Sequence, residues 1–107
     1  MFSVKDDTIT VTRGDTLRVE IELQDVNGEK YNPSENDIVR IKAKRAFDKE
    51  LSINKEIDHN SMIFELSSEE CSNLLVGDYY YDLVITFENG DVNTPINYGK
   101  IIVRSDV

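Results

Sequence analysis

Residues 74–89 constrain the fold most, because here a long run of aromatic and aliphatic residues alternates with polar ones. In an extended chain successive side chains point to opposite faces, so alternate residues share one face. Val84 is the one apolar residue among the polar set, and Gly77 lies just before the alternating residues begin. The pattern predicts a central strand buried on one side. The shared face is expected to carry Tyr79, Tyr81, Leu83, Ile85 and Phe87.

The same alternation recurs along the chain and is typical of an antiparallel sheet with one buried face. Turn residues separate the runs, among them Asn27-Gly28 and Asn89-Gly90. Pro95 predicts an irregular or edge segment over 91–98, and Gly99 is a candidate bulge. Strands are predicted at 8–12, 16–24, 38–46, 51–57 and 62–66, and again at 100–104.

A short helix is predicted between the fifth strand and the central one. Ser67 and Glu70 have the spacing of a capping box, in which each side chain bonds the backbone of the other residue. One to two turns should follow and end before Gly77. Cys71 should be half-buried packing within that helix. As the single cysteine of the chain, it excludes an internal disulfide.

Size and charge limit the class of protein. The 107 residues suit one domain, spanning 1–107. No apolar run approaches the ~20 residues of a membrane span, and the first residues lack the pattern of a secretory signal. The net charge of −9 would repel a phosphate backbone, so we expect no nucleic acid and no membrane among the partners. Residues 1–7 form either a frayed terminus or a tether to another subunit.

The sequence contains few residues in a pattern typical of a catalytic or metal site. The one histidine, His59, lies beside a polar turn without a second ligand at metal spacing. Carboxylates are so numerous, at 21, that a pair meeting in space carries no information. Arg13-Gly14-Asp15 can be an integrin ligand, but between two strands it fits a plain turn. We expect no metal, no cofactor and no enzyme activity.

A basic row on the third predicted strand is the candidate partner-binding site. It would face outward on an acidic protein, either to pair with Glu20 and Glu22 across the sheet or to dock an acidic partner. The following strand, interrupted by Lys55, should be an edge with free backbone groups for docking. The predicted partner-binding residues are Arg40, Lys42, Lys44, Leu51, Ile53 and Lys55.

Together these elements predict an all-β, immunoglobulin-like antiparallel β-sandwich of about seven strands, with one short helical turn before the penultimate strand. Tyr79 occupies the place of the corner tyrosine of such domains, and Tyr81 that of their core cysteine. The run Ile9-x-Val11-x-Arg13-Gly14-Asp15-Thr16 and the run Leu75-x-Gly77-Asp78-Tyr79-x-Tyr81-Asp82 carry a closer resemblance. With the asparagine–glycine turns, Thr94 and the final Ile-Ile-Val, the chain resembles small immunoglobulin-like proteins of tailed phages and prophages of Gram-positive bacteria. It is similar in particular to the amino-terminal domain of their upper baseplate protein.

That resemblance implies a virion structural protein of tail, baseplate or capsid, made in the cytoplasm of the bacterial host. Its partners would be other virion proteins or further copies of itself, and the family offers no catalytic residues. Two alternatives stay open. One is a carbohydrate-binding module that uses exposed aromatic residues such as Tyr31, Tyr80 and Tyr98. The other is a cell-surface adhesion module, against which the missing signal sequence speaks.

Overall fold

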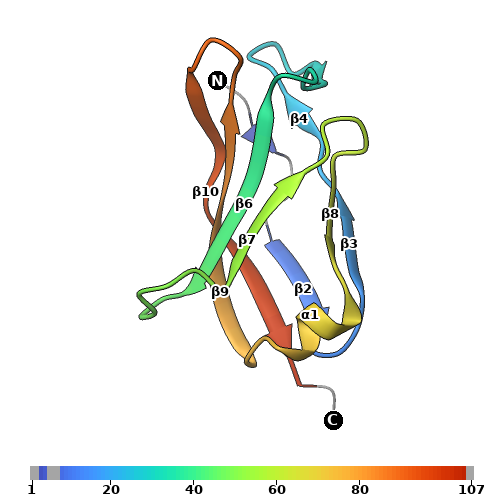
Figure 1. Ribbon diagram of the computed structural model, residues 1–107, viewed down its shortest axis with the longest axis vertical. Helices are drawn as coiled ribbons and strands as arrows, with labels where there is room; N and C mark the ends of the chain where they lie inside the picture. The colour runs from blue at the N-terminus through green and yellow to red at the C-terminus, as the bar shows by residue number, and fades with distance from the viewer. Residues whose placement is uncertain (1–2, 5–7, 106–107) are drawn as a thin grey trace.

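The computed structural model describes residues 3–4 and 8–105. Within these ranges the chain forms one helix and ten strands, several of them very short (Figure 1). In chain order they are β1 (Ser3–Val4), β2 (Thr8–Thr12), β3 (Leu17–Glu20), β4 (Leu23–Gln24), β5 (Lys30–Tyr31), β6 (Ile38–Arg45), β7 (Ile53–Ile57), β8 (Ile63–Leu66), α1 (Ser68–Ser72), β9 (Gly77–Thr86) and β10 (Val92–Arg104).

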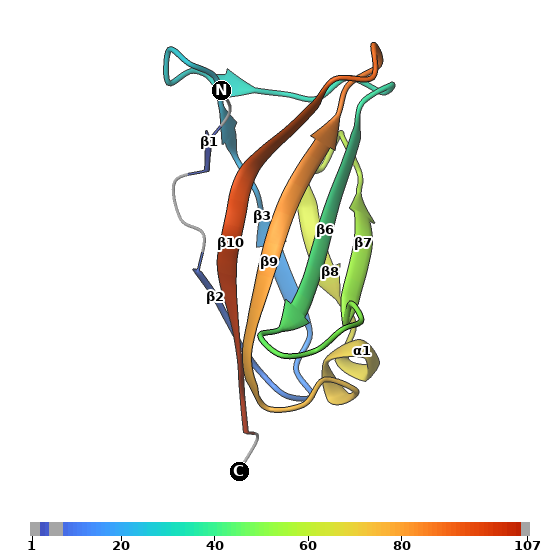
Figure 2. The ribbon, with the colours of Figure 1, turned by 90° about the vertical axis from the view of Figure 1, so that its left-hand side faces the viewer.

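Two layers pack face to face, and Figure 2 shows them with the larger sheet in front. The larger sheet has the order β2-β10-β9-β6-β7. Behind it, β3 pairs with β8, and β4 continues that layer between β1 and β5. The protein is thus an immunoglobulin-like β-sandwich, as predicted. The expectation of a purely antiparallel sheet is wrong, because β10 pairs with β2 in parallel.

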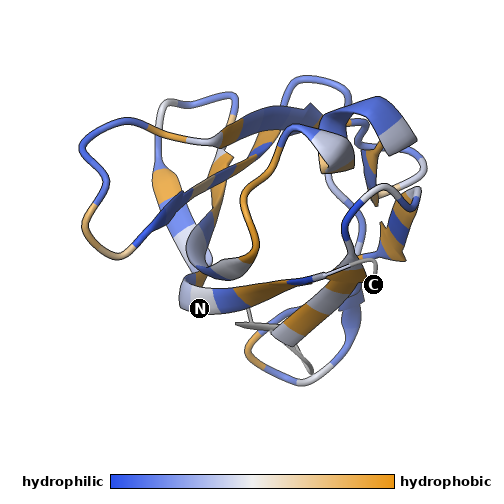
Figure 3. Cartoon of the chain, turned by 90° about the horizontal axis from the view of Figure 1, so that it is seen from below, coloured by the Kyte–Doolittle hydropathy of each residue, from blue (hydrophilic) through white to orange (hydrophobic). Residues whose placement is uncertain are grey.

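The central strand is β9, which lies between β6 and β10. Tyr79, Tyr81, Leu83 and Ile85 are all buried on its inner face, whereas Phe87 is half-buried beyond the end of the strand. Strands around the interior alternate between hydrophobic and hydrophilic residues (Figure 3). This confirms the predicted core face.

The hydroxyl of Tyr79 donates a 2.7 Å hydrogen bond to the carbonyl oxygen of Leu75. Burial raises the pKa of Tyr79, because the charged phenolate would lose its hydration. A tyrosine bonded to the backbone a few residues upstream is the corner arrangement predicted from the sequence.

The predicted strand over 16–24 divides into two pieces, β3 and β4. The turn at Arg13-Gly14-Asp15 carries the chain from β2 in the first layer to β3 in the second, where Ile21 N–H still bonds the Met62 carbonyl at 2.8 Å. Glu20 and Glu22 therefore lie in the second layer. The expectation that they pair with the basic row of β6 is wrong, because the two sets belong to different sheets.

The same turn is held against α1. Arg13 Nε donates to the Ser72 carbonyl at 3.1 Å, and Ser68 Oγ donates to the Gly14 carbonyl at 2.6 Å. Gly14 has φ +92°, a conformation that favours glycine. The prediction of a plain turn is confirmed, and two of its three residues are bound to the helix.

Helix α1 has the predicted capping box. Glu70 N–H donates to Ser67 Oγ at 3.1 Å, and Ser67 N–H donates to Glu70 Oε1 at 3.0 Å. Cys71 is fully buried, not half-buried as expected, because it faces the core from this helix. Burial raises the pKa of its thiol, which disfavours the reactive thiolate. The predicted tether at 1–7 lies outside the described residues except for β1, whose backbone pairs with β4.

Candidate functional site

The outer face of the larger sheet carries two lysines of the predicted basic row. Lys42 and Lys44 alternate on β6, and both are exposed. Their neighbours on β9 are Asp82 and Tyr80, respectively. Within the described part of the chain neither lysine forms an ion pair, which is notable on a protein of net charge −9. The two ammonium groups are thus available to an outside anion.

Arg40, the third member of the predicted row, is already used within the sheet. Its Nη1 donates to Asn54 Oδ1 at 2.9 Å, and its Nη2 lies 4.0 Å from Glu56 Oε1. Ile53, on the adjoining strand, is a core residue that is only 5% exposed. The prediction that Arg40 and Ile53 belong to the partner site is not supported by their contacts.

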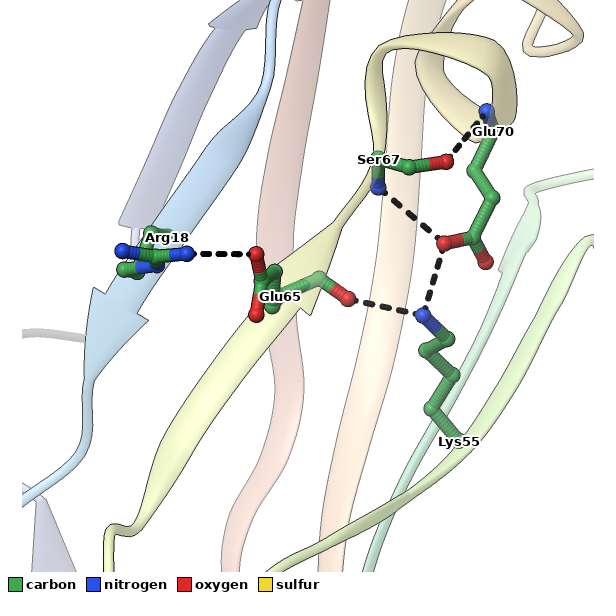
Figure 4. A network of polar contacts seen from close by, with 5 residues as sticks. All are labelled: Arg18, Lys55, Glu65, Ser67 and Glu70. Carbon is green, nitrogen blue, oxygen red and sulfur yellow. Dashed lines mark hydrogen bonds and ion pairs between the residues drawn. The ribbon is translucent and has the colours of Figure 1, made fainter.

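Lys55 lies on the inner side of the edge strand β7, in the seam between the two layers. Its Nζ donates to the Glu65 carbonyl and to Glu70 Oε1, both at 2.8 Å (Figure 4). Glu65 in turn accepts from Arg18 Nη2 at 2.7 Å. An inward-pointing lysine on an edge strand discourages pairing with another chain. Lys55 therefore binds β7 to β8 and α1, and it does not lie with Lys42 and Lys44.

This network makes stability depend on pH. A hydrogen bond from Lys55, and next the backbone N–H of Ser67, lower the pKa of Glu70 from its ordinary 4.5. A lowered folded-state pKa adds stability that is present above pH 4.5 and is lost as the pH falls through the folded-state value.

We expect Glu70→Gln to lower the free energy of unfolding by about 0.5–1 kcal/mol at pH 7, a small value because both partners are partly exposed. The difference between wild type and variant should shrink as the pH falls below 4.5. Urea unfolding of both proteins at several pH values measures this difference in the free energy of unfolding. A difference that stays constant with pH would show that Glu70 acts through its shape and not its charge.

The loop between β6 and β7 carries an exposed phenylalanine, Phe47, that sequence reasoning missed. Phe47 is 99% exposed at this loop and Leu51 is 46% exposed. Arg45 holds the base of the loop, with Nε and Nη2 donating to the two carboxylate oxygens of Asp48 at 3.0 and 3.3 Å. In Figure 1 the loop projects away from both sheets. The available signal was a lone phenylalanine among charged residues, with no apolar neighbour at strand spacing.

Two of the three tyrosines proposed for carbohydrate binding lie together. The rings of Tyr80 and Tyr98 stack with centroids 4.6 Å apart and planes at 13°. Tyr98 is 68% exposed and has φ +66°, which for a residue with a side chain costs of order 1–3 kcal/mol. Tyr31 lies elsewhere: its hydroxyl donates to Asp37 Oδ2 at 3.1 Å and its ring meets Phe87 edge-on.

Candidate metal ligands do not cluster in the described ranges. In residues 3–4 and 8–105 no three histidine, cysteine or acidic side chains come close enough to hold a metal ion. His59 Nδ1 lies 3.8 Å from Oδ1 of its neighbour Asp58. The helix present in these ranges, five residues long, is too short to span a membrane.

No protein-family model matches the chain, and no curated protein matches its sequence. Solved structures do. Murine CRIg is similar over 100% of this chain and 99% of its own, with a TM-score of 0.52 and 9% identity. The fibronectin(III)-like modules of Clostridium thermocellum CbhA are similar over 98% of both chains, with a TM-score of 0.51 and 12% identity.

At such low identity these similarities describe the fold alone. Both structures belong to immunoglobulin-like and fibronectin-III-like folds, whose domains are typically non-catalytic. We conclude that the chain is an immunoglobulin-like or fibronectin-III-like β-sandwich domain.

Proposed function

We propose that the chain is a non-enzymatic structural protein of a tailed phage or prophage virion, and that it docks onto an acidic neighbour protein. The docking would use a hairpin surface, which consists of Phe47, Lys49 and Leu51 on the loop and Lys42 and Lys44 beside it. The observation that carries the docking proposal is the side chain of Phe47, 99% exposed on a loop that Arg45 and Asp48 hold in place.

An exposed phenylalanine on an ordered loop suits an interface anchor. Burying it would contribute roughly 1.5–3 kcal/mol, and aromatic anchors at interface centres dominate binding energies. Because Arg45 and Asp48 already hold the base of the loop, the loop would lose little conformational freedom on binding. Leu51 widens the apolar area beside it.

Charge indicates the partner's chemistry. Lys42, Lys44 and Lys49 are exposed and have no ion pair within the described chain, although acidic residues outnumber basic ones by 21 to 12. Positive groups at the rim of an apolar anchor favour a partner with an acidic surface, and they speed the encounter. The virion context is supported by the sequence resemblance to phage immunoglobulin-like proteins.

The test is incorporation into particles. Particles are purified after induction of the strain that encodes the chain, and the chain is quantified in them by mass spectrometry. Neutralising the two row lysines, in Lys42→Gln/Lys44→Gln, should lower incorporation about three- to tenfold, as expected for rim charges. The matched control is Lys30→Gln/Arg104→Gln, which removes the same charge from exposed residues elsewhere.

The outcomes separate the two parts of the proposal. The control should be incorporated as well as wild type. The melting temperatures of both double variants should lie within a few degrees of the wild-type value. Absence of the wild-type chain from particles would refute the virion assignment. Equal incorporation of the two doubles would refute the hairpin surface.

A further inference from the structure

A pocket of about 270 Å³ lies on the outer face of the larger sheet, at the foot of the β6–β7 loop. Its walls come from the loop and from β6, β9 and β10, and these three strands are held together by sheet pairing. The residues that matter most in it are Lys42, Lys44, Leu51, Tyr80, Asp82 and Tyr98.

Tyr98 is placed in this pocket by an irregular backbone. The pairing of β10 with β9 shifts register between Ile96 and Gly99, and within that interval Tyr98 adopts φ +66°. The Tyr98 N–H, freed from the ladder, donates to Asp82 Oδ1 at 2.9 Å. The bulge thus turns an aromatic side chain outward onto Tyr80, and in this stack Tyr98 stays 68% exposed.

The charges in the pocket favour an anion. Lys42 and Lys44 line it, and no ion pair engages either of them within residues 3–4 and 8–105. Arg45 also lines it but is bound to Asp48. The one acidic lining residue, Asp82, is engaged with the Tyr98 N–H through one of its oxygens.

We propose that this pocket binds an anionic saccharide, a sugar unit that carries a carboxylate or phosphate group. An amphipathic aromatic face accommodates the apolar side of a sugar ring, while the two ammonium groups meet the anion. Asp82 and the exposed Asn97 can bond hydroxyl groups. A simple inorganic anion would leave the tyrosines unused, and a neutral sugar would leave the lysines unused. The volume accommodates one sugar unit rather than a folded partner.

The pocket shares Lys42, Lys44 and Leu51 with the hairpin surface, so an anionic sugar would compete there with the docked neighbour; the test of sugar binding needs no partner protein. The full chain is titrated with glucuronic acid, glucose 6-phosphate and glucose, and backbone amide shifts are followed by NMR. The two anionic sugars distinguish a carboxylate from a phosphate ligand. We expect at least one of them to shift the amides of Tyr98 and Lys44, with glucose binding about tenfold more weakly.

Variants then assign the contacts. Tyr98→Asn removes the ring but keeps a residue that tolerates positive φ, and should weaken anionic sugar binding about tenfold; Tyr98→Phe should retain it. Lys42→Gln/Lys44→Gln should erase the preference over glucose, whereas Lys30→Gln should preserve it. Amide spectra show whether each variant is folded.

Several results would overturn the proposal. These are equal binding of all three sugars, shifts that fall away from the pocket, or no shift at millimolar sugar. Tighter binding of hexaglutamate at the same amides would assign the pocket to an acidic peptide instead.

Discussion

Gly99→Ala is expected to destabilise the protein by about 1–3 kcal/mol, the usual cost of overpacking a core. A Cβ at this position would lie 2.6 Å from Tyr81 Cε1 and 2.7 Å from Ile96 Cγ2. Both neighbours are buried, at 2% and 4% exposure, so neither can move into solvent. Thermal unfolding measures the loss, at about 4–8 °C for each kcal/mol in a domain of this size.

A second variant identifies the cause. Tyr81→Leu removes the ring atoms that the new methyl group would meet, so Gly99→Ala should cost less in that background. Because Ile96 still lies close, part of the cost should persist. A coupling of about 0.5–3 kcal/mol between the two changes is expected. Strictly additive losses would mean that the glycine is needed for another reason, such as the bulge itself.

Phe47→Ser should reduce docking about 30-fold while leaving the fold intact, since hot-spot aromatics contribute about 2 kcal/mol or more. A side chain that is 99% exposed contributes little to the core, so unfolding should change by no more than about 0.5 kcal/mol. Wild type and variant are co-expressed, and their ratio in purified particles is read by mass spectrometry.

Val26→Ser is the matched control. Val26 is 75% exposed in the β4–β5 turn, at the other end of the sandwich from the β6–β7 loop (Figure 1). Asp25 Oδ1 accepts from the backbone of Asn27 and Glu29 there, so this turn is ordered too. The control variant should enter particles in a 1:1 ratio with wild type. A 1:1 ratio for the Phe47 variant as well would remove Phe47 from the interface.

The parts of the fold that follow from periodicity were predictable. Alternation identified the buried face of β9 and of β6, and the spacing of Ser67 and Glu70 identified α1. Alternation does not say which sheet a strand joins. The parallel pairing of β2 and the separation of Glu20 from the basic row therefore required the three-dimensional structure.

The candidate site was only partly predictable, for a similar reason. Alternation correctly placed Lys42 and Lys44 on the outer face of their strand, but it did not predict that they line one pocket with Leu51. Lys55 was predicted correctly to interrupt the apolar row of its strand, where it faces inward with Ile53 and Ile57, but its bonds to Glu65 and Glu70 were not predicted. The outward position of Tyr98 depends on a bulge, and apart from Gly99 no residue in the sequence indicates that register shift.

The central claim, that the β6–β7 loop is covered in the assembled particle, is tested most directly by cysteine labelling. Native Cys71 is fully buried, so a cysteine introduced on the surface reacts alone with a maleimide. Glu50→Cys probes the loop before β7, and Asn60→Cys probes the turn beyond the other end of that strand. We predict that assembly slows labelling at position 50 about tenfold or more and leaves position 60 unchanged. Equal labelling of position 50 in free chain and particle would contradict the account.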